Sequence, residues 1–327
     1  MFPVSRAHLL TAQMLLLTLR EMSDTPRIVV GNLDPTEARV LRDLGAVYID
    51  ERDVDLTGRM PRLEWTKKYR EAGWYLQMFL NLSVDRYVDA EHVLIFDSEV
   101  FVFDNWDESK LFDPASGRPR CFYWVPSSRK SEWEYRIYRG AAFVLEHLPG
   151  CEGVLEEASS DTFHRHISGV QMYSTSNLAT LWRRLERETD LDGVMDRLFN
   201  HEPDLAFSDD DFYGIAADRG VFDRTVPVEP YPDLLGWYDN HDDPVFNRFA
   251  ANAMWSMCQQ YWEYPTASAY LGFMQSMASR LDRTLPALDR LSAARIVEIP
   301  ASRADSLRRA VRRWRRRLPG LVRRAHP

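Results

Sequence analysis

The chain has 327 residues, of which 45% are hydrophobic and 12% aromatic. Such a composition can bury a large core, which excludes a disordered or fibrous protein. The net charge is −8, yet residues 301–327 contain ten Arg and one Asp, so the rest of the chain is strongly acidic. An acidic body argues against a nucleic-acid-binding surface on the main domain, and no nucleic-acid partner is expected.

The cysteines and the apolar segments indicate a cellular compartment. Cys121, Cys151 and Cys258 are widely spaced and form no CxxC motif, so they predict neither a disulfide framework nor a zinc site. The longest apolar segment, Leu9 to Leu19, is too short to span a bilayer. It also lacks the basic region and the cleavage site of a signal peptide. We therefore expect a cytoplasmic protein.

The first part of the chain predicts a β-α-β unit. Apolar spacing favours a buried helix over His8 to Glu21, and Arg27 to Gly31 is typical of a short strand. Asp34-Pro35-Thr36-Glu37 is typical of a helix start, and Gly45 fits the residue that follows a helix end. Ala46 to Asp50 is expected to be the next strand. Two strands joined in this way predict a parallel sheet.

The same patterns continue along the chain. Helical spacing is found over Lys67 to Leu82, and the apolar run Val93 to Phe96 is typical of a buried strand in a parallel sheet. A further strand is expected over Pro119 to Val125, and a further helix over Asn177 to Arg187. The aromatic-rich residues 244–280 are predicted to be helical. Together these patterns predict an α/β fold.

Two carboxylates, Asp97 and Glu99, follow directly after the run Val93 to Phe96. Ligands of parallel sheets bind beyond the carboxyl ends of the strands. Side chains at i and i+2 in extended or turn geometry point the same way, so both acids can reach one ion. Oxygen ligands suit Mg²⁺ or Mn²⁺, with phosphate oxygens and water completing the shell. The alternative is a β-turn that carries two solvated acids.

Several short motifs together resemble a known family. Gly73-Trp74-Tyr75-Leu76-Gln77 precedes the acid-bearing strand, a segment His166 to Tyr173 follows it, and Ser208 to Gly214 forms a later acidic motif. In order and rough spacing, over about residues 15–225, these resemble nucleotide-sugar glycosyltransferases of the GT-A fold, and more narrowly a family of bacterial glycosyltransferase-like proteins. The resemblance implies metal-dependent transfer of a sugar from a nucleotide-sugar donor to a glycan or glycolipid acceptor.

The resemblance also implies roles for acidic residues. Asp97 and Glu99 take the place of the Asp-x-Asp motif, which binds the cation that bridges the diphosphate of the donor. Asp209 and Asp211 fall on the two Glu positions of the family, and Asp209 is the first candidate for a general base. The alternative is an exposed helix N-terminus whose acids complement the helix dipole. His241 is the candidate for a late third metal ligand.

Further residues are expected around the donor and the acceptor. Trp74 and Gln77 are candidates for the lining of the donor site, although Trp74 also fits a core position. Gly169 resembles an acceptor-side glycine whose backbone approaches the sugar closely. His166 and Tyr213 belong to the same motifs and are expected to contact the substrate.

Two features depart from the family pattern. Glu99 stands where the family has Asp, and only Met1 to Val4 precede the first helix, where a GT-A domain has a full first strand. Either Phe2 to Val4 is that strand in abbreviated form or the start is truncated. A non-catalytic homologue that binds glycans or partners is therefore one alternative function. A metal-dependent phosphohydrolase or nucleotidyltransferase is another, because these enzymes also use paired acids at a strand end.

The basic tail carries a pattern of its own. Apolar residues including Trp314 recur at helical spacing among the ten Arg, which predicts that residues 303–324 attach to an anionic membrane surface at its inner face. The alternatives are a tail that folds back onto the acidic body or stays disordered. The expected organisation is a GT-A-like catalytic domain with a mostly parallel central sheet flanked by helices (1–235), a C-terminal helical extension (236–300) and this tail (301–327).

Overall fold

A computed structural model describes residues 1–20, 22, 24–60, 72–123, 132–157, 163–166, 169–202, 204–222, 228–230, 253–258, 264–286, 288–293 and 296–298. The strands are β1 (Phe2–Val4), β2 (Arg27–Gly31), β3 (Ala46–Asp50), β4 (His92–Phe96), β5 (Val100–Val102), β6 (Cys121–Tyr123), β7 (Val170–Ser174), β8 (Val228–Pro230) and β9 (Trp255–Met257). The helices are α1 (Leu9–Arg20), α2 (Pro35–Asp43), α3 (Ala72–Leu82), α4 (Glu132–Leu145), α5 (Val154–Glu157), α6 (Thr175–Glu188), α7 (Leu191–Asp196), α8 (Asp209–Asp218), α10 (Ala267–Arg280) and α11 (Leu288–Ala293).

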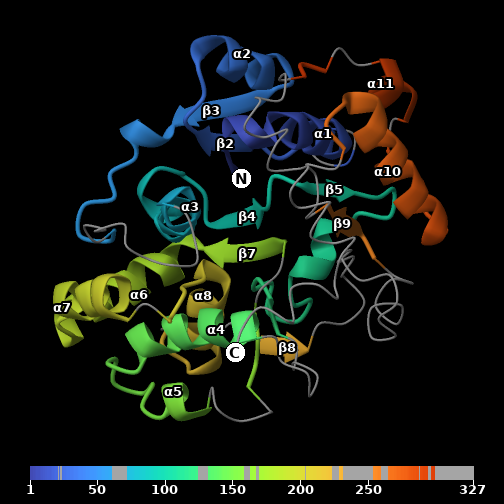
Figure 1. Ribbon diagram of the computed structural model, residues 1–327. Coiled ribbons are helices and arrows are strands. Elements are labelled where there is room, and N and C mark those ends of the chain that lie inside the picture. Colours follow the sequence, from blue (N-terminus) through green and yellow to red (C-terminus); the bar gives the residue numbers. More distant parts are fainter. Residues whose placement is uncertain are drawn as a thin grey trace, which may run out of the picture.

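In the described part of the chain, five strands follow one another in the order β3-β2-β1-β4-β7 (Figure 1). β1, β2 and β3 pair in parallel. The Met1 nitrogen donates to the Leu94 carbonyl at 2.5 Å, and the Phe96 N–H donates to the Met1 carbonyl at 2.9 Å. These two bonds flank Ile95 as in a parallel ladder, so β4 continues the sheet in parallel. β7 then pairs with β4 in the antiparallel direction.

The strand order predicts where on the sheet a ligand binds. β1, β2 and β3 run outward to one edge, whereas β4 returns to the other side of β1. The order therefore reverses between β1 and β4, and ligands of such sheets bind at the carboxyl ends of the strands at the reversal. Asp97 is the first residue after the carboxyl end of β4. The fold thus brings the acid pair to the predicted binding edge.

Most elements expected in the first part of the chain are confirmed. α2 begins with a capping box, in which Asp34 accepts hydrogen bonds from the Thr36 and Glu37 amides and Glu37 binds the Asp34 amide. Gly45 follows the helix with a φ of 89°, a conformation that favours glycine. Phe2–Val4 forms a strand, in agreement with the abbreviated first strand. The expected α/β fold is confirmed.

The C-terminal part differs from its prediction. Residues 255–257 lie in the range expected to be helical, yet they form β9, which pairs with β5 in the antiparallel direction. The backbone N–H and C=O groups of β5 need hydrogen-bond partners. Pairing with β9 supplies them, and this outweighs the local helical pattern. α10 and α11 are helical as expected. Residue 241 and the basic tail, 301–327, lie outside the described residues.

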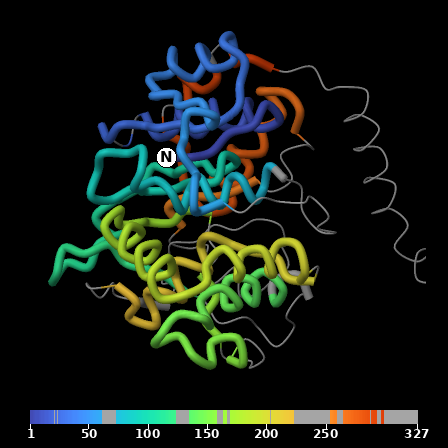
Figure 2. Tube along the Cα trace, turned by 90° about the vertical axis from the view of Figure 1, so that its left-hand side faces the viewer, coloured from blue at the N-terminus to red at the C-terminus, as the bar shows by residue number. Residues whose placement is uncertain are grey.

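Most of the helices form two groups, on opposite sides of β4 and β7. Figures 1 and 2 show α4 to α8 together on one side of β4 and β7, and α1 and α2 on the other. α10 contributes Tyr270 and Met274 to a buried cluster with Met14 and Leu17 of α1. No described helix has the length and hydropathy needed to cross a membrane.

α4 packs closely against the segment that leads into α8. A Cβ built on Gly140 in α4 would lie 1.7 Å from the Ala206 carbonyl oxygen, so a glycine is required for this approach. Ala206 is followed two residues later by Ser208, whose side chain accepts a hydrogen bond from the Asp211 amide and caps α8. Gly140 therefore sets the position of the acidic N-terminus of α8.

Replacement of Gly140 tests this packing. We expect Gly140→Ala to lower the free energy of unfolding by about 1–3 kcal/mol, because the backbone must shift to admit the methyl group. Gly272 in α10 has no neighbouring atom within 4 Å of a built Cβ, so Gly272→Ala is expected to raise stability by about 0.5–1 kcal/mol. Urea unfolding measures both, and equal effects of the two variants would contradict the account.

Candidate functional site

The acid pair lies in a tight turn between β4 and β5. The Asp97 amide donates to the Gly169 carbonyl at 2.9 Å, and the Val100 amide donates to the Asp97 carbonyl at 3.0 Å, which closes the turn. The Ser98 hydroxyl donates to Glu99 Oε2 at 2.9 Å. Taken as whole residues, Asp97 and Glu99 are half-buried. We call residues 97–100 the acid turn.

The acid turn is a β-turn, and a second acidic segment lies near it. Burial and the charges of Glu99 and Asp209 raise the pKa of Asp97 well above its ordinary value. Asp209 is the first residue of α8, far from the acid turn in sequence. The fold therefore gathers three carboxylates from two segments, and their mutual repulsion favours either a proton or a cation among them.

One face of α3 carries amide side chains that bind both acidic segments. Gln77 Nε2 donates to Asp97 Oδ1 at 3.4 Å, and Asn81 Nδ2 donates to Asp209 Oδ2 at 2.8 Å. Residues four apart in a helix lie on one face with Cβ atoms about 5–6 Å apart. The two acids thus lie side by side along α3. Gln77 was singled out from the sequence as a candidate for the donor site, whereas Asn81 was missed. Its place four residues after Gln77, on the same face of the helix, is the signal that could have found it.

Asp209 is buried and strongly hydrogen-bonded. Its Oδ2 accepts from Asn81 and also from the Tyr173 hydroxyl at 3.2 Å. The same hydroxyl lies 3.2 Å from Asp210 Oδ1. Burial raises the pKa of Asp209 to about 6, while the hydrogen bonds from Asn81 and Tyr173 oppose the increase. Asp209 is therefore a carboxyl group that changes its charge close to neutral pH.

Asp211 has a different environment, in spite of its nearness in sequence. It is fully buried, and Arg165 Nε donates to both of its oxygens, at 3.2 and 3.1 Å. The His166 amide donates to Asp211 Oδ1 at 2.8 Å. The exposed helix N-terminus considered from the sequence is wrong, because Asp209, Asp210 and Asp211 are all buried. Arg165 was not singled out in the sequence, where a lone Arg carries no signal of its partner.

His166 and Tyr213 are both fully buried and hold α8 in place. His166 Nδ1 lies 3.0 Å from the Phe122 carbonyl oxygen, which can only accept, so Nδ1 carries the proton. Burial lowers the pKa of His166 to about 4. A Cβ on Gly214 would lie 2.0 Å from His166 Cγ, so the ring rests directly on α8. The Tyr213 hydroxyl accepts from the Ser174 amide at 3.2 Å.

The other predicted residues lie at the edge of the site. Trp74 is half-buried in α3 and makes an edge contact with Tyr75 at 5.0 Å between ring centroids. Gly169 lies beside Asp97 through their backbone hydrogen bond. The close approach at Gly169 is to protein rather than to open space, because a Cβ there would lie 2.2 Å from Met257 Cε.

The donor atoms of the site fit a hard divalent cation. Asp97 and Glu99 offer carboxylate oxygens, the ligands that Mg²⁺ and Mn²⁺ prefer. Asn81 Oδ1 is buried and has no hydrogen-bond partner within the described residues. A group of three side chains already arranged to hold a metal is not found among those residues. His241, the predicted third ligand, lies outside them.

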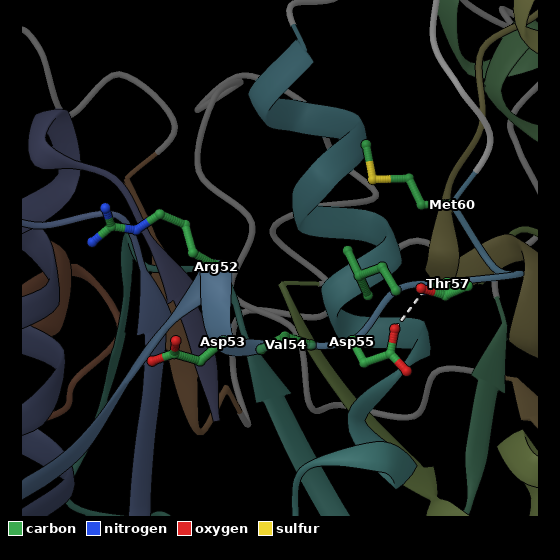
Figure 3. A pocket seen from close by; sticks show the side chains of 7 residues that line it. Arg52, Asp53, Val54, Asp55, Thr57 and Met60 are labelled. Carbon is green, nitrogen blue, oxygen red and sulfur yellow. Dashed lines mark hydrogen bonds between the residues drawn. The ribbon is translucent and has the colours of Figure 1, made fainter.

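An open hollow of about 530 Å³ lies beyond the carboxyl end of β3 (Figure 3). β3 and β4 are parallel and three strand spacings apart, about 14 Å. The hollow therefore opens at the same edge of the sheet as the acid turn. It was not foreseen, because the sequence shows only a polar loop there. Its lining residues are Arg52, Asp53, Val54, Asp55, Leu56, Thr57 and Met60.

No family model and no curated protein matches the sequence. Among solved structures, the galactosyltransferase LgtC in complex with donor and acceptor sugar analogues has a TM-score of 0.47 and 15% identity, covering 85% of this chain and 94% of that chain. An active-site mutant of LgtC has a TM-score of 0.45 and 13% identity, covering 88% and 97%. The bifunctional glycosyltransferase WbbM has a TM-score of 0.44 and 12% identity, covering 89% and 50%. Residue roles in this chain follow from its own geometry.

The raised pKa of Asp209 predicts a dependence of stability on pH. A carboxyl whose pKa rises on folding, here from 3.8 to about 6, stabilises the folded state below pH 4 and loses that contribution as the pH rises through 6. We expect Asp209→Asn to be more stable than the wild type at pH 8, by up to about 3 kcal/mol, and similar to it at pH 4. Urea unfolding without divalent cations measures this, with the exposed Asp192→Asn as control. A less stable variant at pH 8 would contradict the account.

Replacement of Asp211 is expected to lower stability, in contrast to replacement of Asp209. Asp211→Ala leaves Arg165 buried without its carboxylate and should cost about 3–5 kcal/mol of stability. The double variant Arg165→Met with Asp211→Leu removes both charges and should recover part of this loss. Unfolding curves of the single and double variants test the buried pair. A single variant as stable as the wild type would show that the pair contributes nothing.

Proposed function

We propose that the chain is a metal-dependent glycosyltransferase that moves a sugar from a nucleotide-sugar donor to a glycan or glycolipid acceptor. The observation that carries the proposal is the convergence of the acid turn with Asp209 at the reversal of the strand order. Ligands bind at that position in open α/β sheets. A cation held by two carboxylates beside a third, proton-accepting carboxylate suits a reaction that expels a diphosphate.

Asp97 and Glu99 are the proposed ligands of Mn²⁺ or Mg²⁺. When bound, such an ion neutralises the charge that develops on a departing nucleoside diphosphate. Gln77 orients Asp97 from α3, and Ser98 orients Glu99 from within the acid turn. His241 stays a candidate for a further ligand. Because Glu has one more methylene group than Asp, Glu99 places its carboxylate about one bond farther from the backbone than Asp would.

Asp209 is the proposed general base. A carboxyl with a pKa of about 6 is ionised at neutral pH and can still accept a proton from an acceptor hydroxyl. Asn81 and Tyr173 hold its Oδ2, which fixes the direction of the carboxylate. Asp211 would act indirectly: its pair with Arg165 fixes the first turn of α8. His166 and Tyr213 hold the same helix in place. Because both side chains are buried, their predicted contacts with the substrate would require α8 to move away from its neighbours.

The hollow beyond β3 is the proposed place for the nucleoside of the donor. It combines charged groups, Arg52, Asp53 and Asp55, with the apolar side chains of Val54 and Leu56. A nucleoside diphosphate can extend from there along the sheet edge to the acid turn. Trp74 and Gln77 lie on α3, which contacts the acid turn through Gln77, and are proposed donor-side residues.

The partners and the location stay proposals that follow from this activity. The basic segment 303–324 would bring a cytoplasmic enzyme to the anionic inner face of the membrane, where a glycolipid acceptor is held. A glycan acceptor in solution would not need that attachment. No nucleic-acid partner is proposed, because residues 1–300 are acidic.

Calorimetry with a panel of nucleoside diphosphates, with and without Mn²⁺, tests the activity. We expect one diphosphate to bind in a Mn²⁺-dependent manner and Asp97→Ala to weaken that binding by at least about tenfold, because a ligand of the cation is lost. The exposed Asp89→Asn serves as control. Binding of no nucleotide would favour a non-catalytic homologue. Release of phosphate from a nucleotide without any sugar acceptor would favour a phosphohydrolase.

A further inference from the structure

The backbone of the acid turn is held by residues from the C-terminal part of the chain. The Cys258 amide donates to the Glu99 carbonyl at 3.0 Å, and the Tyr270 hydroxyl donates to the same oxygen at 3.1 Å. Cys258 directly follows β9, and Tyr270 lies in α10. One carbonyl thus receives hydrogen bonds from two separate elements, both more than 150 residues away in sequence.

The surroundings make this contact a fixed one. β9 pairs with β5, the strand that leaves the acid turn, and the Phe103 amide donates to the Met254 carbonyl at 2.9 Å. Met257 and Trp255 fill the space at Gly169, whose carbonyl binds the Asp97 amide. Figure 1 shows α10 next to β5 and β9. Residues of the C-terminal part therefore contact the Glu99 end of the acid turn directly and its Asp97 end through Gly169.

The ring of Tyr270 is fully buried, so its hydroxyl has little freedom to move away. It packs near Phe273, with ring centroids 6.1 Å apart, and Phe273 also faces Phe101 of β5 at 6.1 Å. Met274 of the same helix belongs to the buried cluster that includes Met14 of α1. This packing holds the ring even when the hydroxyl is removed. A Phe at this position is therefore expected to fold.

We propose that residues 253–258 and 264–281 support the cation site from outside it, and that Tyr270 is a positioning residue that fixes Glu99 for the ion. The inference rests on the proposed function for the presence of a cation. The physical basis of the inference is the Glu99 carbonyl. The direction of this carbonyl sets the peptide plane between Glu99 and Val100. With this plane fixed, the backbone at Glu99 is held in place, and with it the point from which the Glu99 side chain reaches the ion.

Tyr270→Phe removes one of the two hydrogen bonds to the carbonyl and keeps the ring. We expect the dissociation constant of Mn²⁺, measured by calorimetry on the full chain, to rise about three- to tenfold, as the loss of one hydrogen bond predicts. The matched control is Tyr87→Phe, because the Tyr87 hydroxyl donates to the Leu80 carbonyl at 2.8 Å, outside the acid turn. The control should keep the Mn²⁺ affinity of the wild type.

Hydrogen exchange without any cation separates this inference from the proposed function. The Val100 and Cys258 amides should exchange faster in Tyr270→Phe than in the wild type, and at an unchanged rate in Tyr87→Phe. If the wild type binds no Mn²⁺ but exchange rises, the positioning of the turn holds and the cation role fails. Unchanged exchange together with unchanged Mn²⁺ affinity in Tyr270→Phe would overturn the inference. A loss of affinity as large in Tyr87→Phe would also overturn it.

Discussion

Like charges confined to a small space constrain the candidate site. Asp97, Glu99 and Asp209 lie close enough for two of them to raise the pKa of the third. Removal from water makes each negative charge costly unless hydrogen bonds or a cation compensate it. The surrounding elements supply part of that compensation, since amide side chains from α3 and a hydroxyl from β7 donate to these carboxylates. A proton on Asp97 or a bound cation would complete the compensation, and the second of these is the basis of the proposed metal site.

The rest of the fold is arranged so that this cluster forms in one place. The β1–β4 ladder brings the acid turn to the reversal of the strand order. The close contact of Gly140 with Ala206 and the buried pair of Arg165 with Asp211 place the N-terminus of α8 opposite it. From the other direction, β9 and α10 fix the backbone of the turn. Elements from the beginning, middle and end of the chain thus converge on three side chains.

Features with a local cause were predictable from the sequence. The capping box at Asp34 and the placement of Asp97 after a buried strand depend on neighbours within a few residues. Asn81, Arg165 and the Tyr270 contact have causes that lie far along the chain, and a single sequence does not show which distant residues meet. β9 shows the same limit: a helical pattern in its region gave way to pairing with β5. The burial of Asp211 also depends on a distant partner, since only the fold brings Arg165 to it.

The proposed metal site requires that Asp97 and Glu99 together hold one divalent cation at the reversal of the strand order. The most direct measurement is an anomalous difference map from crystals grown with Mn²⁺ and a nucleoside diphosphate. We expect a manganese peak within about 2.2 Å of a carboxylate oxygen of both residues, with the diphosphate on its open side. A well-ordered acid turn with no manganese between these carboxylates, or a diphosphate bound elsewhere, would contradict it.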